Sequence, residues 1–313
     1  MDAESLRQRL TELLSFAVSP VPELLILGER ERDGYVEQVV GYTGNEGEVP
    51  ALLLVPEHPC GAGVVALHQH NSQWHLGKSE VAGLAGAPLQ AFGPALARAG
   101  IVVLAPDGVG FEDRRHTGPG IDEREDDSLQ YFNEMTYRLL SGRLLMTTVL
   151  GDAACGLSVL IADERVERSR VGVLGHSYGG NVAIMLAALD ERVRFASASA
   201  SACSYKQRML DRTGIELAHV IPGILELTDI GQLVELIAPR PLLLLSATED
   251  RYSADAPQIV QAAARAYRAA GAPQALQHHR AQGGHTLTEE RFKAIVDWMT
   301  AQLNENGNVV GQS

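Results

Sequence analysis

The sequence predicts an α/β fold, in which a mostly parallel sheet is covered by helices on both faces and begins with an antiparallel hairpin. Continuous apolar runs bounded by Gly, Pro or Asp recur along the chain, and longer helical stretches lie between them. Apolar strands without alternation are typical of parallel sheets that are buried on both faces. The alternation of strand and helix favours right-handed crossovers around one sheet.

The expected elements follow from these patterns in chain order. Leucines at helical spacing among charged residues predict an amphipathic helix near the start. Strands are expected at 35–40 and 51–55 (the hairpin), 63–67, 101–105, 171–174, 195–200, 242–246 and 275–280, and helices at 89–98, 144–161, 182–189, 256–270 and 289–303. We predict a single domain over 1–313, with an N-terminal helical extension (1–34), a loop or small cap over the site (111–137) and a frayed tail (304–313).

The composition excludes several classes of partner. The formal charge of −13 opposes binding to nucleic acid and anionic membranes, which attract clustered Lys and Arg. The first fifteen residues contain charged side chains and no apolar signal core, and the longest apolar runs look too short to cross a bilayer. Cys60, Cys155 and Cys203 lack metal-type spacing and suggest reduced thiols. We therefore expect a cytoplasmic protein that binds neither nucleic acid nor membrane.

The most informative motif is Gly175-His176-Ser177-Tyr178-Gly179. It directly follows an apolar strand and directly precedes an apolar helix. This context is typical of a nucleophile elbow, where small flanking residues make room for a strained serine. Ser177 is therefore the expected nucleophile, and it needs a base and an acid to activate it.

The acid and the base are expected downstream, in that order. The strand 242–246 leads into Asp250, the expected acid, with Glu249 as the alternative. His285 lies on a glycine loop just after the last predicted strand, whereas His278 and His279 fall inside that strand. The order of the residues therefore predicts a Ser177–Asp250–His285 triad.

The remaining site residues are expected on loops at the same edge of the sheet. An oxyanion hole would use the backbone N–H of Tyr178 and that of His70 or its neighbour Gln69. Trp74, His75, Asp113 and Tyr131 are the candidates for the substrate pocket, although charges such as Asp107 and Asp113 are ordinarily just solvated on loops. His68, His70 and His75 could also be considered as metal ligands, but no companion carboxylate stands at a recognised spacing, so no metal is expected.

These features resemble the dienelactone hydrolase-like and acetyl-xylan-esterase-like branch of the α/β-hydrolase superfamily, from about residue 35 to 299. The likeness is carried by the serine elbow together with Val65-Ala66-Leu67-His68-Gln69, Gly77-Lys78-Ser79-Glu80, Val103-Leu104-Ala105-Pro106-Asp107 and Ile237-Ala238-Pro239-Arg240-Pro241. Dienelactone hydrolases proper use a cysteine nucleophile, whereas Ser177 stands here. The resemblance implies hydrolysis of a carboxylic ester or lactone through an acyl-enzyme, without a cofactor.

Other functions compatible with the same residues remain open. The triad would serve a peptidase or amidase equally, and an acyltransferase would resolve the acyl-enzyme with an alcohol instead of water. A non-catalytic ligand-binding protein on the same fold is the alternative from another class. The expected partner is a small-molecule ester or lactone, and a homodimer is a compatible assembly.

Overall fold

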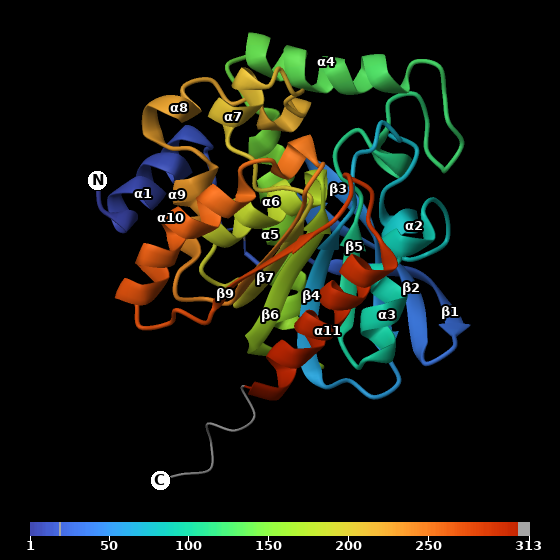
Figure 1. Ribbon diagram of the computed structural model, residues 1–313. Coiled ribbons are helices and arrows are strands. Elements are labelled where there is room, and N and C mark those ends of the chain that lie inside the picture. The colour runs from blue at the N-terminus through green and yellow to red at the C-terminus, as the bar shows by residue number, and fades with distance from the viewer. Residues whose placement is uncertain (19, 306–313) are drawn as a thin grey trace.

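The computed structural model describes residues 1–18 and 20–305, and its centre is a nine-stranded sheet (Figure 1). The strand order is β1-β2-β3-β5-β4-β6-β7-β8-β9. The strands are β1 (Leu24–Arg32), β2 (Tyr35–Gly44), β3 (Gly47–Pro56), β4 (Gly61–Leu67), β5 (Val102–Pro106), β6 (Val166–His176), β7 (Phe195–Ser199), β8 (Leu242–Ala247) and β9 (Leu276–Ala281). Strands β4 to β9 run parallel, whereas β1, β2 and β3 form an antiparallel meander that joins β5.

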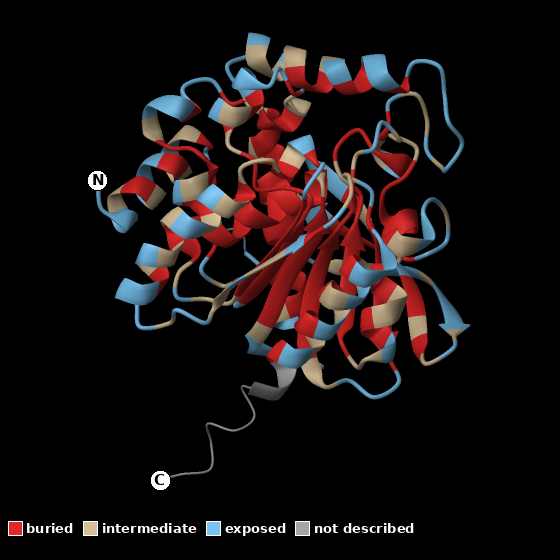
Figure 2. Cartoon of the chain, in the orientation of Figure 1, coloured by how far each residue is buried: buried red, intermediate tan, exposed pale blue. Residues whose placement is uncertain are grey.

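Helices cover both faces of the sheet, as the apolar strands predicted. On one face the core includes residues of α1 (Ala3–Leu13), α5 (Leu145–Ala162), α6 (Tyr178–Leu189), α9 (Ile230–Ile237) and α10 (Ala256–Ala269), and on the other face residues of α2 (Lys78–Val81), α3 (Phe92–Arg98) and α11 (Glu289–Glu305). The central strands β4, β5, β7 and β8 are almost wholly buried between these layers (Figure 2). The doubly covered, mostly parallel sheet is thus confirmed.

One longer helix and two short ones lie toward the top of the molecule in Figure 1. They are α4 (Asp127–Leu140), α7 (Tyr205–Leu210) and α8 (Ile224–Leu227), and α4 runs along the top of the molecule in Figure 1. The N-caps of two helices in this region satisfy free backbone N–H groups: Ser204 accepts from the Gln207 N–H ahead of α7, and Asp229 forms a capping box with Gln232 ahead of α9. The chain between β7 and β8 therefore contains short helices that the sequence patterns did not predict.

The N-terminal region differs from the expected helical extension. Among the described residues of 1–34, only α1 forms an α-helix, and the expectation is wrong for residues 24–32, which form β1. This strand pairs with β2 alone at the edge of the sheet, and most of its side chains are exposed on both sides. Backbone hydrogen bonds to β2 hold this strand in place, and its side chains are not buried in the core. Its sequence therefore shows no apolar pattern that would predict a strand. Of the predicted tail, residues 306–313 lie outside the described residues, and α11 continues to Glu305.

Helix α5 corrects the expectation that no apolar run could cross a bilayer. By length and composition alone, this helix would pass as a membrane span, and Asp152 is its one charged residue. Nearly all of α5 is buried against the sheet and against α6. The apolar surface of α5 therefore packs inside the protein core.

Buried ion pairs hold the loop that follows β5. The Lys78 ammonium lies 2.7 Å from Asp107, 2.6 Å from Glu112 and 2.6 Å from Asp113. The Asp107 and Glu112 side chains are buried, so the expectation of a solvated loop charge is wrong for Asp107, whereas Asp113 is exposed but paired with Lys78. These three carboxylates are the one group with metal-ligand geometry among the described residues, and Lys78 supplies its cation. The cluster fixes this loop against α2.

Candidate active site

Ser177 lies in the sharp turn between β6 and α6, with a backbone φ of 54° and ψ of −116°. A side chain in this region of φ and ψ is strained, so the surrounding backbone must enforce the conformation. A Cβ at Gly175 would collide with the Gly179 carbonyl, and a Cβ at Gly179 would collide with the Leu67 carbonyl. Both positions therefore need glycine for the close packing of strand, turn and helix.

The structure brings His285 and Asp250 to this serine. The Nε2 atom of His285 lies 2.8 Å from the Ser177 Oγ, and its Nδ1 lies 2.9 Å from an Asp250 carboxylate oxygen. Asp250 follows β8 and His285 follows β9, so neighbouring parallel strands deliver both side chains to one edge of the sheet. Glu249, the alternative acid, points to solvent. The three side chains form a continuous hydrogen-bonded relay.

The Asp250 carboxylate is buried and held in its ionised form. Burial by itself would raise the pKa of Asp250, but hydrogen bonds from His285, Ser253 and the Tyr252 N–H outweigh it and hold that pKa below its usual range. An ionised Asp250 can only accept a hydrogen bond, so the His285 ring nitrogen that faces it must carry the hydrogen. This fixes the His285 tautomer with a hydrogen on Nδ1 and leaves Nε2 to accept the serine proton.

Two backbone N–H groups near Ser177 are free to bind an oxyanion. The Tyr178 and His70 N–H groups have no acceptor in the part of the chain that the structure describes. The loop after β4 lies directly against the first turn of α6, because Gly179 lets the Leu67 and His68 carbonyls approach. His70 lines the cavity at Ser177, whereas Gln69 is buried and is not among the lining residues. This placement favours His70 over Gln69.

A cavity of about 350 Å³ opens at Ser177 and His285. Of the four expected pocket residues, Trp74 lines it and His75 does not. Asp113 is also absent from its wall, because it is engaged by Lys78. Tyr131 is fully buried behind the wall, where its ring packs against His70 and Trp74. These three expectations for the cavity surface are therefore wrong, although Tyr131 supports residues that do line it.

Residues that the sequence patterns did not indicate complete the wall. Asn181 lies one helical turn after Ser177, and Arg208 belongs to α7. The Tyr252 ring lies 4.7 Å from the His285 ring, measured between centroids. Glu216 accepts hydrogen bonds from the Tyr131 hydroxyl, the Ala218 N–H and the His219 ring. Burial would raise the pKa of Glu216, but the hydrogen bonds from His219 and Tyr131 outweigh it and lower that pKa.

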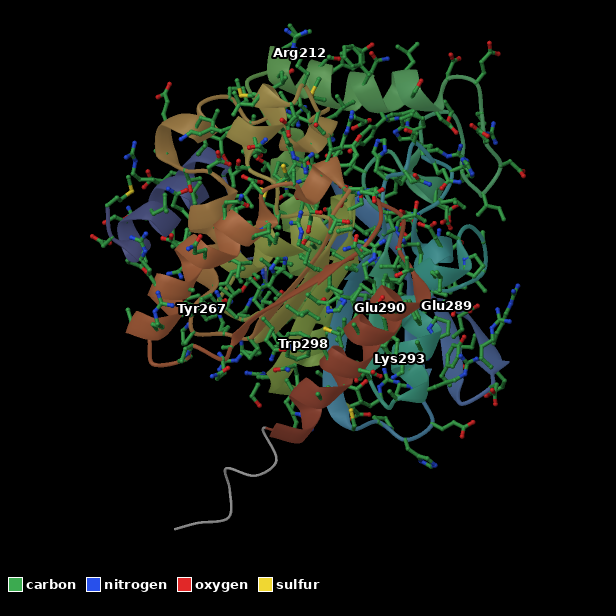
Figure 3. All side chains as sticks on the ribbon, viewed as in Figure 1. Arg212, Tyr267, Glu289, Glu290, Lys293 and Trp298 are labelled. Atoms are coloured by element: carbon green, nitrogen blue, oxygen red, sulfur yellow. The ribbon has the colours of Figure 1, made fainter. Side chains whose placement is uncertain are left out.

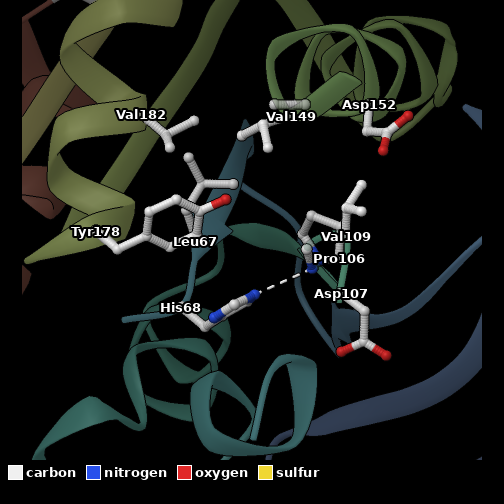
Figure 4. Close-up of a pocket in the computed structure, with 11 residues that line it drawn as sticks. Leu67, His68, Pro106, Asp107, Val109, Val149, Asp152, Tyr178 and Val182 are labelled. Atoms are coloured by element: carbon white, nitrogen blue, oxygen red, sulfur yellow. Dashed lines mark hydrogen bonds between the residues drawn. The ribbon is translucent and has the colours of Figure 1, made fainter. Parts of the chain in front are cut away.

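A second, apolar hollow of about 30 Å³ lies beneath Tyr178, and His68 forms part of its wall (Figure 4). The His68 ring is nearly inaccessible; its Nε2 accepts the Gly108 N–H, and its Nδ1 donates to the Gln69 carbonyl. Burial lowers the pKa of His68 to about 4. The histidine is therefore neutral in the folded protein at neutral pH, and no metal is needed to occupy its ring nitrogens.

Neutral His68 should make the protein sensitive to acid. Unfolded His68 takes up a proton below about pH 6.5, whereas the folded form stays neutral until about pH 4. Its contribution to the free energy of unfolding is thus complete above this window and is lost as the pH falls through it. We expect urea midpoints to fall over this range, and to fall less in His68→Gln, whose amide oxygen can still accept from Gly108. A decline as steep in His68→Gln as in the wild type would refute this; His58→Gln, at an exposed histidine, is the control.

Comparison with known proteins supports the fold. The candidate hydrolase YtaP of Bacillus subtilis (strain 168) is 29% identical over 291 residues, which cover 88% of this chain and 92% of YtaP. A candidate acetyl xylan esterase of Bacteroides fragilis NCTC 9343 superimposes with a TM-score of 0.71 at 18% identity, over 89% of this chain and 74% of that one. A glucuronoyl esterase of Solibacter usitatus gives 0.68 at 16% identity, over 96% and 94%.

The family match falls on the part of the chain that carries the relay. Residues 142–306, just over half of the chain, match the prolyl oligopeptidase family. This segment contains the serine elbow, Asp250 and His285, and the structural neighbours support the α/β-hydrolase fold. The chain therefore belongs to the prolyl oligopeptidase family, within the serine hydrolases of the α/β-hydrolase superfamily.

Proposed function

We propose that this protein hydrolyses carboxylic esters, lactones included, through an acyl-enzyme formed on Ser177. The relay of Ser177, His285 and Asp250 at the mouth of a cavity is the observation that carries the proposal. A neutral hydroxyl is a weak nucleophile, and this relay supplies a base at 2.8 Å with a carboxylate that orients it. The named esterases among the structural neighbours make an ester the first substrate class to test.

In the proposed reaction, Ser177 Oγ attacks the ester carbonyl while His285 Nε2 takes its proton. The charge that develops on the carbonyl oxygen is met by the backbone N–H groups of Tyr178 and His70. His285 then returns the proton to the departing alcohol, and the acyl group stays on Ser177. Water, deprotonated by the same histidine, releases the acid and restores the serine.

Amide hydrolysis is the second candidate, because the matching family is named for oligopeptide hydrolysis. The same relay attacks amides, whose leaving amines need protonation by His285. Aminoacyl p-nitroanilides, with and without proline, therefore belong in the substrate panel beside esters. Faster turnover of these anilides than of matched p-nitrophenyl esters would favour the peptidase over the esterase.

The test of the proposed function is labelling combined with a substrate panel. We expect a fluorophosphonate probe to attach to Ser177, identified by peptide mass spectrometry, because only an activated serine reacts with it. We also expect turnover of p-nitrophenyl acyl esters, lactones or acetylated sugars, with the shape of the cavity deciding among them. Absence of both labelling and turnover would instead favour a ligand-binding protein on this fold.

A further inference from the structure

Arg208 is a nearly buried cation in the wall of the cavity at Ser177. Its residue surface is 6% exposed, and its guanidinium lies 5.4 Å from the centroid of the Tyr252 ring, which in turn contacts His285. One of its nitrogens donates to the Gly214 carbonyl at 3.2 Å. Within residues 1–18 and 20–305, no carboxylate forms an ion pair with it. A guanidinium has five N–H donors, so most of its capacity is unused.

Two neighbours of Arg208 add further donors without acceptors. Asn181 lines the same cavity, and no hydrogen bond of its side-chain amide is found in the described part of the chain. Arg208 and Asn181 also border a small hollow of about 10 Å³, where the buried Tyr205 hydroxyl has no partner. Burial raises the pKa of Tyr205, so this hydroxyl keeps its proton and acts as a donor. Buried donors without acceptors are costly unless a ligand satisfies them.

Glu216 is the one carboxylate among the residues that line this cavity, and its oxygens are already engaged. One oxygen accepts from the Tyr131 hydroxyl, and the other accepts from the Ala218 N–H and the His219 ring. Glu216 therefore offers little to a ligand, whereas Arg208 and Asn181 offer unused donors. The free hydrogen-bonding capacity of this side of the cavity suits an anion, although the protein as a whole carries a charge of −13.

We propose that Arg208 binds a carboxylate of the substrate, so that the preferred esters are monoanions whose carboxylate lies near the scissile carbonyl. This inference rests on the proposed ester hydrolysis at Ser177. Asn181 lies one turn of α6 from the nucleophile, so a carboxylate held there belongs to the same small molecule as the reacting carbonyl. The planar fork of arginine matches a carboxylate, and its stacking on Tyr252 holds the fork in position.

The experiment compares matched esters with and without the charge. One arm sets mono-p-nitrophenyl glutarate against p-nitrophenyl pentanoate, which places the carboxylate on the acyl side. The other arm sets para-acetoxybenzoate against para-tolyl acetate, which places it on the leaving group. In at least one arm, Arg208→Gln should lower the anionic-to-neutral ratio of kcat/KM by about 10- to 100-fold, the usual effect of losing a charged hydrogen bond. Arg208→Lys should keep part of the preference.

The matched control is Arg212→Gln, at an exposed arginine just beyond α7 that projects from the outer surface in Figure 3. It should leave the ratio as in the wild type. If Arg208→Gln leaves the ratio unchanged in both arms, the inference is wrong while the proposed esterase stands.

A binding measurement tests the inference even if no ester is turned over. Calorimetry on Ser177→Ala uses both anionic esters, mono-p-nitrophenyl glutarate and para-acetoxybenzoate. For at least one of them, the added Arg208→Gln change should weaken the affinity by a similar factor. Equal affinity for both esters with and without Arg208 would overturn the inference.

Discussion

Ser177→Ala is expected to lower kcat/KM for ester hydrolysis by about 10⁴- to 10⁶-fold, the scale at which serine triads lose their nucleophile. His285→Ala should lose about as much, because the serine and its base act as one unit. The Ser177→Ala, His285→Ala double variant should then be no slower than either single variant. The measurement is the steady-state rate on the best ester of the panel, with circular dichroism to show that the fold persists.

The control for these variants is His58→Ala, which replaces an exposed histidine outside the cavity and should retain full activity. Additive losses in the double variant would mean that Ser177 and His285 act independently. Full activity in Ser177→Ala would remove this serine from the mechanism altogether.

Lys78→Met should have the largest effect on stability, because it removes the cation from a buried group of carboxylates. Glu112 accepts from the Lys78 ammonium, the Ser79 hydroxyl and two backbone N–H groups, and Asp107 accepts from the ammonium and the Lys78 N–H. Breaking a buried ion pair from one side leaves uncompensated charge and costs about 3–5 kcal/mol. Such a loss is a large part of the 5–15 kcal/mol typical of a folded domain, by order of magnitude.

The pH dependence of this loss gives a second signature. Burial, together with the neighbouring Glu112, raises the pKa of Asp107 even with Lys78 present. A carboxyl whose pKa is higher in the folded than in the unfolded state stabilises the fold as it takes up a proton. The cost of Lys78→Met should therefore shrink as the pH falls from about 8 toward 5, since protonation neutralises the charges left behind.

The comparison variant is Lys293→Met on α11, labelled in Figure 3, which breaks a solvent-exposed pair with Asp297. Urea unfolding should change by no more than about 0.5 kcal/mol there. Adding Glu112→Gln to Lys78→Met should recover part of the lost stability, because one stranded charge disappears. Equal stability of Lys78→Met and the wild type at pH 8 would show that the cluster contributes nothing to the fold.

Much of the fold could be predicted because burial determines most of the strands. Strands β4, β5 and β8 are almost wholly apolar, and β6 and β7 contain apolar or small buried runs, so composition marks these strands. Strand β1 forms through pairing at an exposed edge, so its side chains carry no pattern. The helices between β7 and β8 are short, and the signals for two of them were caps, Ser204 with Gln207 and Asp229 with Gln232, rather than periodicity.

The candidate site, like the fold, could be predicted only in part from the sequence. Ser177, Asp250 and His285 follow predicted strands, so their meeting at one edge of the sheet could be expected from chain order. Arg208 and Glu216 lie in the segment between β7 and β8, and its path over the cavity depends on long-range packing that no local pattern encodes. Arg208 stands three residues after Tyr205 on a capped helix, so the two side chains share one face of α7. This spacing could have indicated Arg208, but an arginine on a helix face is ordinarily exposed to solvent.

The backbone conformation of Ser177 also limits which chemistry this fold could acquire by a single change. A β-branched side chain at a positive φ is a severe outlier, and the turn cannot relax because Gly175 and Gly179 leave no free space around it. Threonine is therefore a poor replacement, whereas cysteine has the same branching as serine. The turn thus accommodates cysteine, which replaces the reacting oxygen with sulfur. It does not accommodate threonine, whose nucleophile would be a secondary alcohol.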